Sequence, residues 1–263
     1  MDNEKVSVIM AVFNCEKTVS AAIDSIVNQT YDNWELIICD DCSSDGTLEI
    51  VNQYNNKYPK KIKVIRNEVN SKLPASLNHC LKYVTGTYVA RMDGDDVSKS
   101  DRFEKQIKYL KSHPGIDLVG SYMDIFNGKE IIGVAKVPEN IDKYHFSIYH
   151  ATIMTYKYVY DKLNGYSLLK RAVRCEDLDL WFRFFAEGFS AANIQKSLYI
   201  VTDDENAKRR RNFKGRINAT RTLLYGYHLL NYPIYRYPFA FNPIIKGLVP
   251  RFISDKLRNT KFK

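Results

Sequence analysis

The chain has 263 residues, of which 45% are hydrophobic and 26% charged, as expected for one large globular domain or two small ones. Its first residues are polar and acidic, so no secretory signal peptide is expected, and no apolar run is long enough to cross a membrane. The five cysteines are an odd number without paired metal-ligand spacing. They favour reduced thiols in the cytosol over a disulfide framework.

The formal net charge of +9 is unevenly distributed. Residues 207–263 contain fourteen Lys or Arg and one acid, whereas residues 1–206 contain 25 basic and 29 acidic residues. Such a basic tail favours a polyanionic partner, either an anionic membrane surface or nucleic acid. We expect the membrane surface and no nucleic acid, because no nucleic-acid-binding module is visible in the rest of the sequence.

Short apolar runs alternate with helical patterns in the first hundred residues. Strands are expected at residues 6–12, 34–39, 62–65 and 88–92, and helices at residues 19–27, from Ser43 or Ser44 onward, and at residues 75–84. Asn14 is the expected N-cap of the first helix. This β-α-β-α order predicts a mostly parallel, Rossmann-like sheet with helices on both faces, an α/β fold.

The pattern becomes mixed after residue 101. Helices are expected at residues 101–112, 158–163 and 176–187, and strands at residues 118–126, 130–137 and 152–156. Asn127-Gly128 is a strong hairpin signal between two of these strands. From residue 206 the sequence has a helical start and then an aromatic, proline-rich stretch from Tyr232 to Phe239.

An apolar run at residues 87–90 is followed, after Arg91 and Met92, by three carboxylates, Asp93, Asp95 and Asp96. Open α/β sheets bind ligands at the carboxyl ends of their strands. Acids this close repel one another unless a cation neutralises them, and hard divalent cations bind both carboxylate and diphosphate oxygens. An acidic turn in solvent is the alternative. A second acidic strand end, Asp40-Asp41, favours a site.

Six segments occur in an order typical of one enzyme family, namely residues 7–14, 25–31, 34–47, 70–78, 91–96 and 176–181. They resemble motifs of family 2 glycosyltransferases of the GT-A fold, and the resemblance covers about residues 5–205. Three positions depart from the pattern. Phe13 stands where Tyr is usual, and Cys42 and Lys72 stand where Gly is usual.

The resemblance implies a nucleotide-sugar donor and a divalent metal. Phe13 would stack on the base, Asp41 would accept from the uracil ring nitrogen, and Asp93 would bind the ribose. The full set implied to bind the donor is Val12, Phe13, Asn14, Asp41, Lys72, Asn78, Arg91, Asp93 and Gly94. The implied ligands of Mn²⁺ or Mg²⁺ are Asp95, Asp93 and His150, although a structural role for His150 is equally open.

Glu176-Asp177 resembles the catalytic acid pair of the family. Asp177 is the candidate general base for the acceptor hydroxyl, and Glu176 is the next candidate. The alternative is that both acids simply begin a helix, where the dipole favours them. One carboxylate opposite the leaving group would give transfer with inversion.

We therefore expect an inverting, metal-dependent glycosyltransferase. Residues 1–100 would bind the nucleotide sugar, residues 101–205 would bind the acceptor, and residues 206–263 would associate with a membrane. The donor would be a UDP-hexose or UDP-N-acetylhexosamine and the acceptor a lipid-diphosphate-linked saccharide, used at the cytoplasmic face of the cell membrane. The alternatives are a nucleotidyltransferase, which would need a Gly-rich phosphate loop that residues 11–14 lack, and a catalytically silent binding protein.

Overall fold

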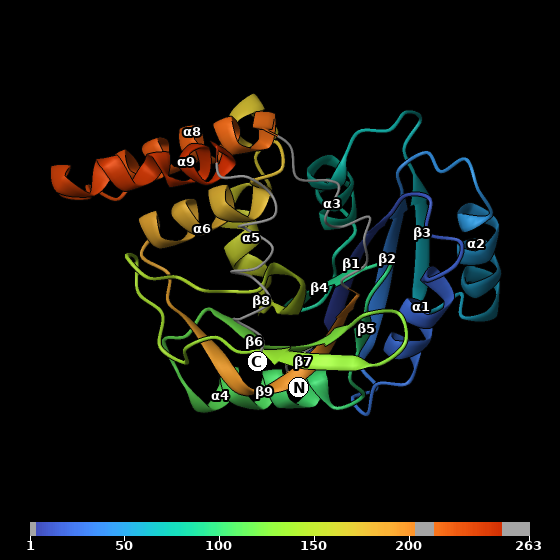
Figure 1. Ribbon diagram of the computed structural model, residues 1–263. Helices are drawn as coiled ribbons and strands as arrows, with labels where there is room; N and C mark the ends of the chain where they lie inside the picture. Colours follow the sequence, from blue (N-terminus) through green and yellow to red (C-terminus); the bar gives the residue numbers. More distant parts are fainter. Residues whose placement is uncertain (1–3, 203–212, 249–263) are drawn as a thin grey trace.

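The computed structural model describes residues 4–202 and 213–248. Its centre is a nine-stranded sheet with the order β3-β2-β1-β4-β8-β6-β9-β5, and β7 pairs with β6 (Figure 1). The strands are β1 (Val6–Val12), β2 (Trp34–Asp40), β3 (Ile62–Arg66), β4 (Tyr88–Asp93), β5 (Val97–Ser98), β6 (Leu118–Phe126), β7 (Ile131–Ala135), β8 (Met154–Tyr156) and β9 (Ala191–Thr202). The helices around it are α1 (Val19–Val27), α2 (Thr47–Lys57), α3 (Leu73–Leu81), α4 (Arg102–Ser112), α5 (Lys157–Leu163), α6 (Glu176–Ala186), α8 (Phe213–Leu229) and α9 (Asn242–Leu248).

The first half of the sheet is parallel, as predicted. β1 lies between β2 and β4, and β3 pairs with the outer side of β2. Val12 is level with Asp40, and Ala11 is level with Asp93. This register brings both acidic strand ends to one edge of the sheet, which is where open α/β sheets bind ligands.

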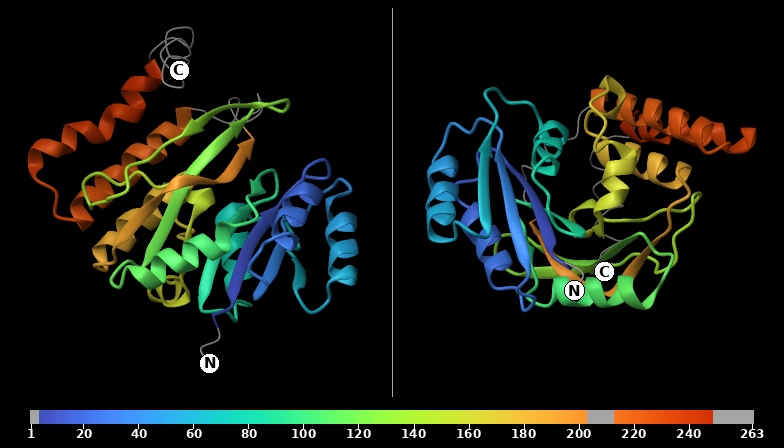
Figure 2. Two further views of the ribbon diagram at one scale, coloured as in Figure 1. Left: turned by 90° about the horizontal axis from the view of Figure 1, so that it is seen from below. Right: turned by 180° about the vertical axis from the view of Figure 1, so that it is seen from behind.

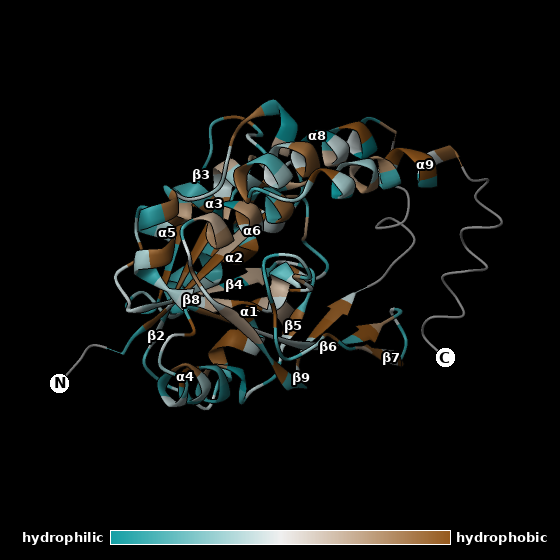
Figure 3. Cartoon of the chain, turned by 90° about the vertical axis from the view of Figure 1, so that its left-hand side faces the viewer, coloured by the Kyte–Doolittle hydropathy of each residue, from teal (hydrophilic) through white to brown (hydrophobic). Residues whose placement is uncertain are grey.

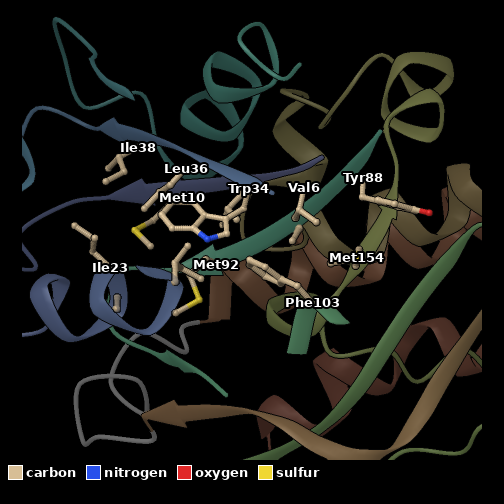
Figure 4. Close-up of a cluster of buried hydrophobic side chains, with 14 of the residues drawn as sticks. Val6, Met10, Ile23, Trp34, Leu36, Ile38, Tyr88, Met92, Phe103 and Met154 are labelled. Atoms are coloured by element: carbon tan, nitrogen blue, oxygen red, sulfur yellow. The ribbon is translucent and has the colours of Figure 1, made fainter. Parts of the chain in front are cut away.

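Side chains that alternate along the strands separate two apolar cores. On β1, Val8 and Met10 face the core that contains α1 and α4, whereas Ile9 faces the core that contains α3, α5 and α6. Figure 4 shows the first core, in which Trp34 and Phe103 lie among aliphatic and methionine side chains. Helices thus cover both faces of the sheet. Because its central strands are buried on both sides, they are apolar at nearly every position.

The second half of the sheet is mixed. β8 is antiparallel to both β4 and β6, while β9 runs parallel to β6 and ends at Thr202. β9 and the short β5 were not expected from the sequence. The 3₁₀-helix η1 (His150–Thr152) occupies the start of the strand predicted at residues 152–156.

The expected helix caps were wrong. α1 begins after Thr18, and α2 begins after Gly46, so neither Asn14 nor Ser43 or Ser44 is an N-cap. Asn14 instead has a φ of 53° and accepts a hydrogen bond from the Ser44 backbone N–H at 2.9 Å. These polar residues therefore join the loops after β1 and β2.

The C-terminal part forms a layer on α6. α8 packs against α6 and the 3₁₀-helix η2 (Lys170–Ala172), and then η3 (Ile234–Phe241) and α9 return alongside α8 (Figure 2). Phe182 of α6 forms a small core with Leu230 and Tyr232. Within residues 4–202 and 213–248, no helix is both long and apolar enough to span a bilayer.

Candidate active site

The acidic turn after β4 forms a compact carboxylate cluster. One oxygen of each of Asp93, Asp95 and Asp96 lies within 4.8 Å of the others. The cluster includes Asp96, which is not among the metal ligands implied by the family resemblance. Gly94 is required here by packing, because a Cβ at this position would lie 2.8 Å from Cγ1 of Val12. The turn therefore lies directly against the end of β1.

A buried arginine partly neutralises the cluster. Nη2 of Arg91 donates to Oδ1 of Asp93 at 2.5 Å. Burial lowers the pKa of Arg91, but the charges around it, Asp93 first, together raise that pKa above its ordinary value. Burial, followed by the charges of Asp93 and Asp95, raises the pKa of Asp96 well above its ordinary range. The uncompensated negative charge makes an all-oxygen cation site chemically favourable.

The end of β9 supports the acidic turn. The backbone N–H of Thr202 donates to Oδ1 of Asp96 at 2.9 Å, and its hydroxyl donates to the carbonyl of Asp95 at 2.8 Å. The hydroxyl of Tyr199 accepts from the backbone N–H of Asp93 at 3.1 Å. Sequence reasoning missed both residues. The β-prone run Leu198–Val201 was the signal that could have identified the strand.

Asp41 organises the loop that leads into α3. Its Oδ1 accepts from the backbone N–H of Ser71 at 2.7 Å and from Nδ2 of Asn67 at 2.8 Å, and its Oδ2 accepts from the backbone N–H of Lys72 at 2.9 Å. Its neighbour Asp40 forms an ion pair with Arg66 at 3.2 Å. Asp41 thus shapes the loop at the edge where a nucleotide base is expected.

Val12, Phe13 and Asn14 lie where β1 leaves the sheet. The carbonyl of Val12 accepts from the backbone N–H of Asp41 at 2.8 Å, which joins the two strand ends. The ring of Phe13 is 46% exposed although it is large and apolar. An exposed ring at the ligand-binding edge is available for stacking on a base.

The two positions where the family usually has glycine adopt positive φ angles. Cys42 has a φ of 63°, and Lys72 has φ 73° and ψ 164°. Residues other than glycine rarely adopt such conformations. The loops therefore keep a glycine-type geometry despite their side chains, and the side chain of Lys72 remains exposed.

Asn78 and His150, both expected to bind ligand, share a protein partner, Tyr166. The amide of Asn78 bonds to both the backbone carbonyl and the backbone N–H of Tyr166, at 2.8 and 2.7 Å. Nε2 of His150 lies 2.8 Å from the hydroxyl of Tyr166, and burial, aided by Arg91, lowers the pKa of this imidazole well below its usual value. His150 is also outside the carboxylate cluster. Both side chains hold the loop at Tyr166.

The acid pair begins α6, and the structure separates its two members. Glu176 is half-buried, and burial, followed by the charge of Asp177, raises its pKa, while Arg91 opposes this shift. Asp177 is exposed and accepts from the backbone N–H of Leu178 at 2.7 Å. The charge of Asp93 in the acidic cluster thus acts on Glu176. Asp177 instead lines a cavity.

That cavity has a volume of about 330 Å³ and lies between α6 and the chain that follows β7. Asp177 and Trp181 line it on the α6 side, and Lys136 and Tyr149 line it on the other. Aromatic walls with a few polar groups are typical of sites for small polar ligands.

Comparisons with known proteins identify the class of enzyme. Residues 7–175 match the profile of Glycosyl transferase family 2. The chain is 42% identical to the "Putative glycosyltransferase EpsE" of Bacillus subtilis, over 96% of this chain and 92% of that protein. It is 34% identical to the Escherichia coli "UDP-Glc:alpha-D-GlcNAc-diphosphoundecaprenol beta-1,3-glucosyltransferase WfgD", over 73% and 75% of the two chains. The chain belongs to glycosyltransferase family 2.

Solved structures agree on the fold. Residues 1–349 of TarS from Staphylococcus aureus, in complex with UDP-GlcNAc, match with a TM-score of 0.68 and 21% identity, over 86% of this chain and 70% of that one. The mannosyltransferase PcManGT of Pyrobaculum calidifontis, in complex with GDP-Man and Mn²⁺, matches with a TM-score of 0.65 and 15% identity, over 97% and 79%. The protein thus has the GT-A fold, as predicted.

Proposed function

We propose that this glycosyltransferase moves a hexose or N-acetylhexosamine, with inversion, from a UDP-sugar to a lipid-diphosphate-linked saccharide. The observation that carries the proposal is a pair of acidic elements, the turn at Asp93–Asp96 and the start of α6, where the charge of Asp93 acts on Glu176. The first suits a donor diphosphate with its metal, and the second suits proton removal from an acceptor. Relatives support this choice of substrates, since WfgD is named for UDP-Glc and a diphosphoundecaprenol acceptor.

The residues present fit a divalent metal. Asp95 and Asp93 would hold Mn²⁺ or Mg²⁺, because the site offers only carboxylate oxygens and has too little positive charge of its own. The metal would act as a Lewis acid on the leaving diphosphate. Asp96 is tied to Thr202 and orients the turn.

The donor nucleotide would lie across the ends of β1, β2 and β4. Phe13 would stack on the base, and the loop that Asp41 holds would meet its polar edge. The side chain of Lys72 is exposed, and its ammonium would approach a phosphate. Arg91 would act indirectly, because its guanidinium holds Asp93 in place for the ribose.

Asp177 is the proposed base. It lines the cavity beside Trp181, where an acceptor sugar could stack, and an exposed carboxylate there can reach the acceptor hydroxyl. Glu176 would set the local field between Asp177 and the acidic cluster. The acceptor lipid requires the enzyme to work at the cytoplasmic face of a membrane, as a peripheral protein.

A UDP-release assay with and without Mn²⁺, run over a panel of nucleotide sugars, tests this function. Metal-dependent UDP release from one UDP-sugar supports it. Release of pyrophosphate from a nucleoside triphosphate would indicate a nucleotidyltransferase instead. Binding of UDP-sugar without any turnover, even with lipid-linked acceptors, would indicate a silent binding protein.

A further inference from the structure

The end of the described chain exposes a series of large apolar side chains. They lie on η3 and α9 between residues 234 and 248, a segment that we call the apolar hook, and they are Ile234, Tyr235, Phe239, Phe241, Ile245 and Leu248. Ile234 is 85% exposed and Leu248 is 73% exposed. Figure 3 colours the end of α9 as hydrophobic where it projects from the rim of the molecule. Several large apolar side chains exposed next to one another usually mark an interaction site.

The hook is firmly attached on its other side. Tyr232, immediately before it, is buried, stacks on Tyr227 with 4.7 Å between ring centroids, and donates to the carbonyl of Lys143. Nη1 of Arg216 donates to the carbonyl of Pro243 at 3.1 Å, and Ala240 is fully buried. The exposed side chains are therefore presented by an anchored element. Tyr232 belongs to the tail that the sequence predicts to associate with a membrane, but its ring packs into the small core with Phe182 and is not available for insertion.

The charged residues of the segment that carries the hook have one sign. Residues 213–248 contain no Asp or Glu in the sequence, and their basic residues are Lys214, Arg216, Arg221, Arg236 and Lys246. Residues 249–263 add five Lys or Arg and one acid, and the basic run at residues 208–211 adds four more, although both stretches lie outside the described residues. Cations beside aliphatic and aromatic side chains match an anionic bilayer, whose headgroups attract the charges while apolar groups enter the interface.

We propose that the apolar hook is a membrane-docking element that inserts its exposed side chains at headgroup depth into an anionic bilayer. This deepens the membrane location in the proposed function by naming the element that makes contact. Insertion also has a consequence for the acid pair, because α8 links the hook to η2. The hydroxyl of Thr222 donates to the carbonyl of Arg171 at 2.9 Å, and the guanidinium of Arg171 lies 3.7 Å from the centroid of the Tyr225 ring. Docking would thus fix the orientation of the site toward an acceptor in the membrane.

A combined variant tests the proposal, with Ile234, Phe239, Ile245 and Leu248 each changed to Ser. The matched control changes Ile131, Ile132 and Val134 of β7 to Ser, since these side chains are also about half exposed. Sedimentation is measured with vesicles of phosphatidylglycerol and phosphatidylcholine, without donor or acceptor, so the result does not depend on catalysis. We expect the hook variant to bind at least about tenfold more weakly than wild type and the control to bind normally. Equal binding by wild type and the hook variant overturns the proposal.

A Tyr235→Trp variant reports insertion directly. The two native tryptophans, Trp34 and Trp181, are each only 3% exposed, so the new indole dominates any change on binding. We expect a blue shift of emission with anionic vesicles that partly persists at high salt, because screening weakens charge attraction but not apolar insertion. Sedimentation without a blue shift would overturn insertion. A second result would also overturn insertion: wild type forms a dimer in solution and does not bind vesicles, and the hook variant is a monomer. The hook would then be a contact between two copies of the chain. Unchanged thermal unfolding and UDP binding verify that each variant is folded.

Discussion

Thr202 and Asp96 are joined by a hydrogen bond of 2.9 Å between residues that are 106 positions apart. The contact connects the end of β9 to the acidic turn after β4, and the same threonine holds the carbonyl of Asp95. The mixed half of the sheet thus fixes the carboxylates that the parallel half presents. A change in either half should therefore alter the carboxylate cluster.

Asp95→Ala should abolish metal-dependent UDP binding while leaving the fold intact. Removing one of three neighbouring carboxylates reduces their repulsion, so the thermal stability of the metal-free protein should stay the same or rise. Calorimetric titration with UDP, in Mn²⁺ and in EDTA, measures the effect. Unchanged affinity in Mn²⁺ would falsify the metal role of this residue.

Asp177→Asn should lower turnover by about 10²–10⁴-fold and spare donor binding, since a positioned general base contributes on that order. The control is Glu176→Gln, which should retain more activity. Initial rates of UDP release and UDP affinity are measured for both variants. If Glu176→Gln loses the larger factor, the base is Glu176.

Glu176→Gln should also change how stability depends on pH. The pKa of Glu176 is raised in the folded protein, so its ionised form is disfavoured there, and the stability that it contributes is lost as pH rises through the folded pKa. The variant should therefore be more stable than wild type at neutral pH and gain nothing under acidic conditions below the unfolded pKa. Thermal unfolding followed across this pH range measures the difference. A gain that is independent of pH would contradict this explanation.

Lys72→Gly should stabilise the protein by about 1 kcal/mol. Its φ of 73° and ψ of 164° belong to a region that costs on the order of 1–3 kcal/mol for a side chain, and the entropy of glycine in the unfolded chain offsets part of the gain. Lys72→Met is the control, because it removes the charge and keeps the strain. Chemical denaturation measures stability, and the UDP-sugar KM of the two variants isolates the role of the charge.

Asp179→Asn should destabilise the protein by about 3 kcal/mol. Its buried carboxylate pairs with Arg171 and with Arg183, each at 2.8 Å, so its loss would leave two partly buried cations without an anion. Urea denaturation of the variant gives the value. A loss below about 1 kcal/mol would mean that the arginines reach solvent or other partners.

The parallel half of the sheet could be predicted because its signals are local. The strands β1, β2 and β4 are buried on both faces and read as apolar runs, and each helix between strands has one apolar face. β9 was missed because polar residues, Gln195, Lys196 and Ser197, interrupt its apolar pattern, and its register against β6 shifts at the same place. The short loops at Asn14 and Cys42 escaped prediction because their positive φ angles depend on contacts between separate strand ends.

The acids of the candidate site follow directly from the sequence, but their surroundings do not. Asn78 and His150 are typical ligand-binding residue types, and no local pattern indicates that Tyr166 engages both. That tyrosine lies 88 and 16 positions away from them, respectively. Long-range packing of this kind decides whether a polar side chain faces a ligand or the protein.

α8 has an implication for protein engineering. Besides its bond to Arg171, it uses Nδ2 of Asn218 to satisfy the carbonyl of Val173 at 3.1 Å, so it holds the last residues before the acid pair. The ring of Phe182 packs so closely on Gly226 that a Cβ there would lie 2.1 Å from it. A chimera in which the acceptor-binding region is exchanged between two relatives would therefore have to include both α6 and α8, because the two helices are packed against each other. Grafting α6 alone would remove the contacts from α8 that support the acid pair.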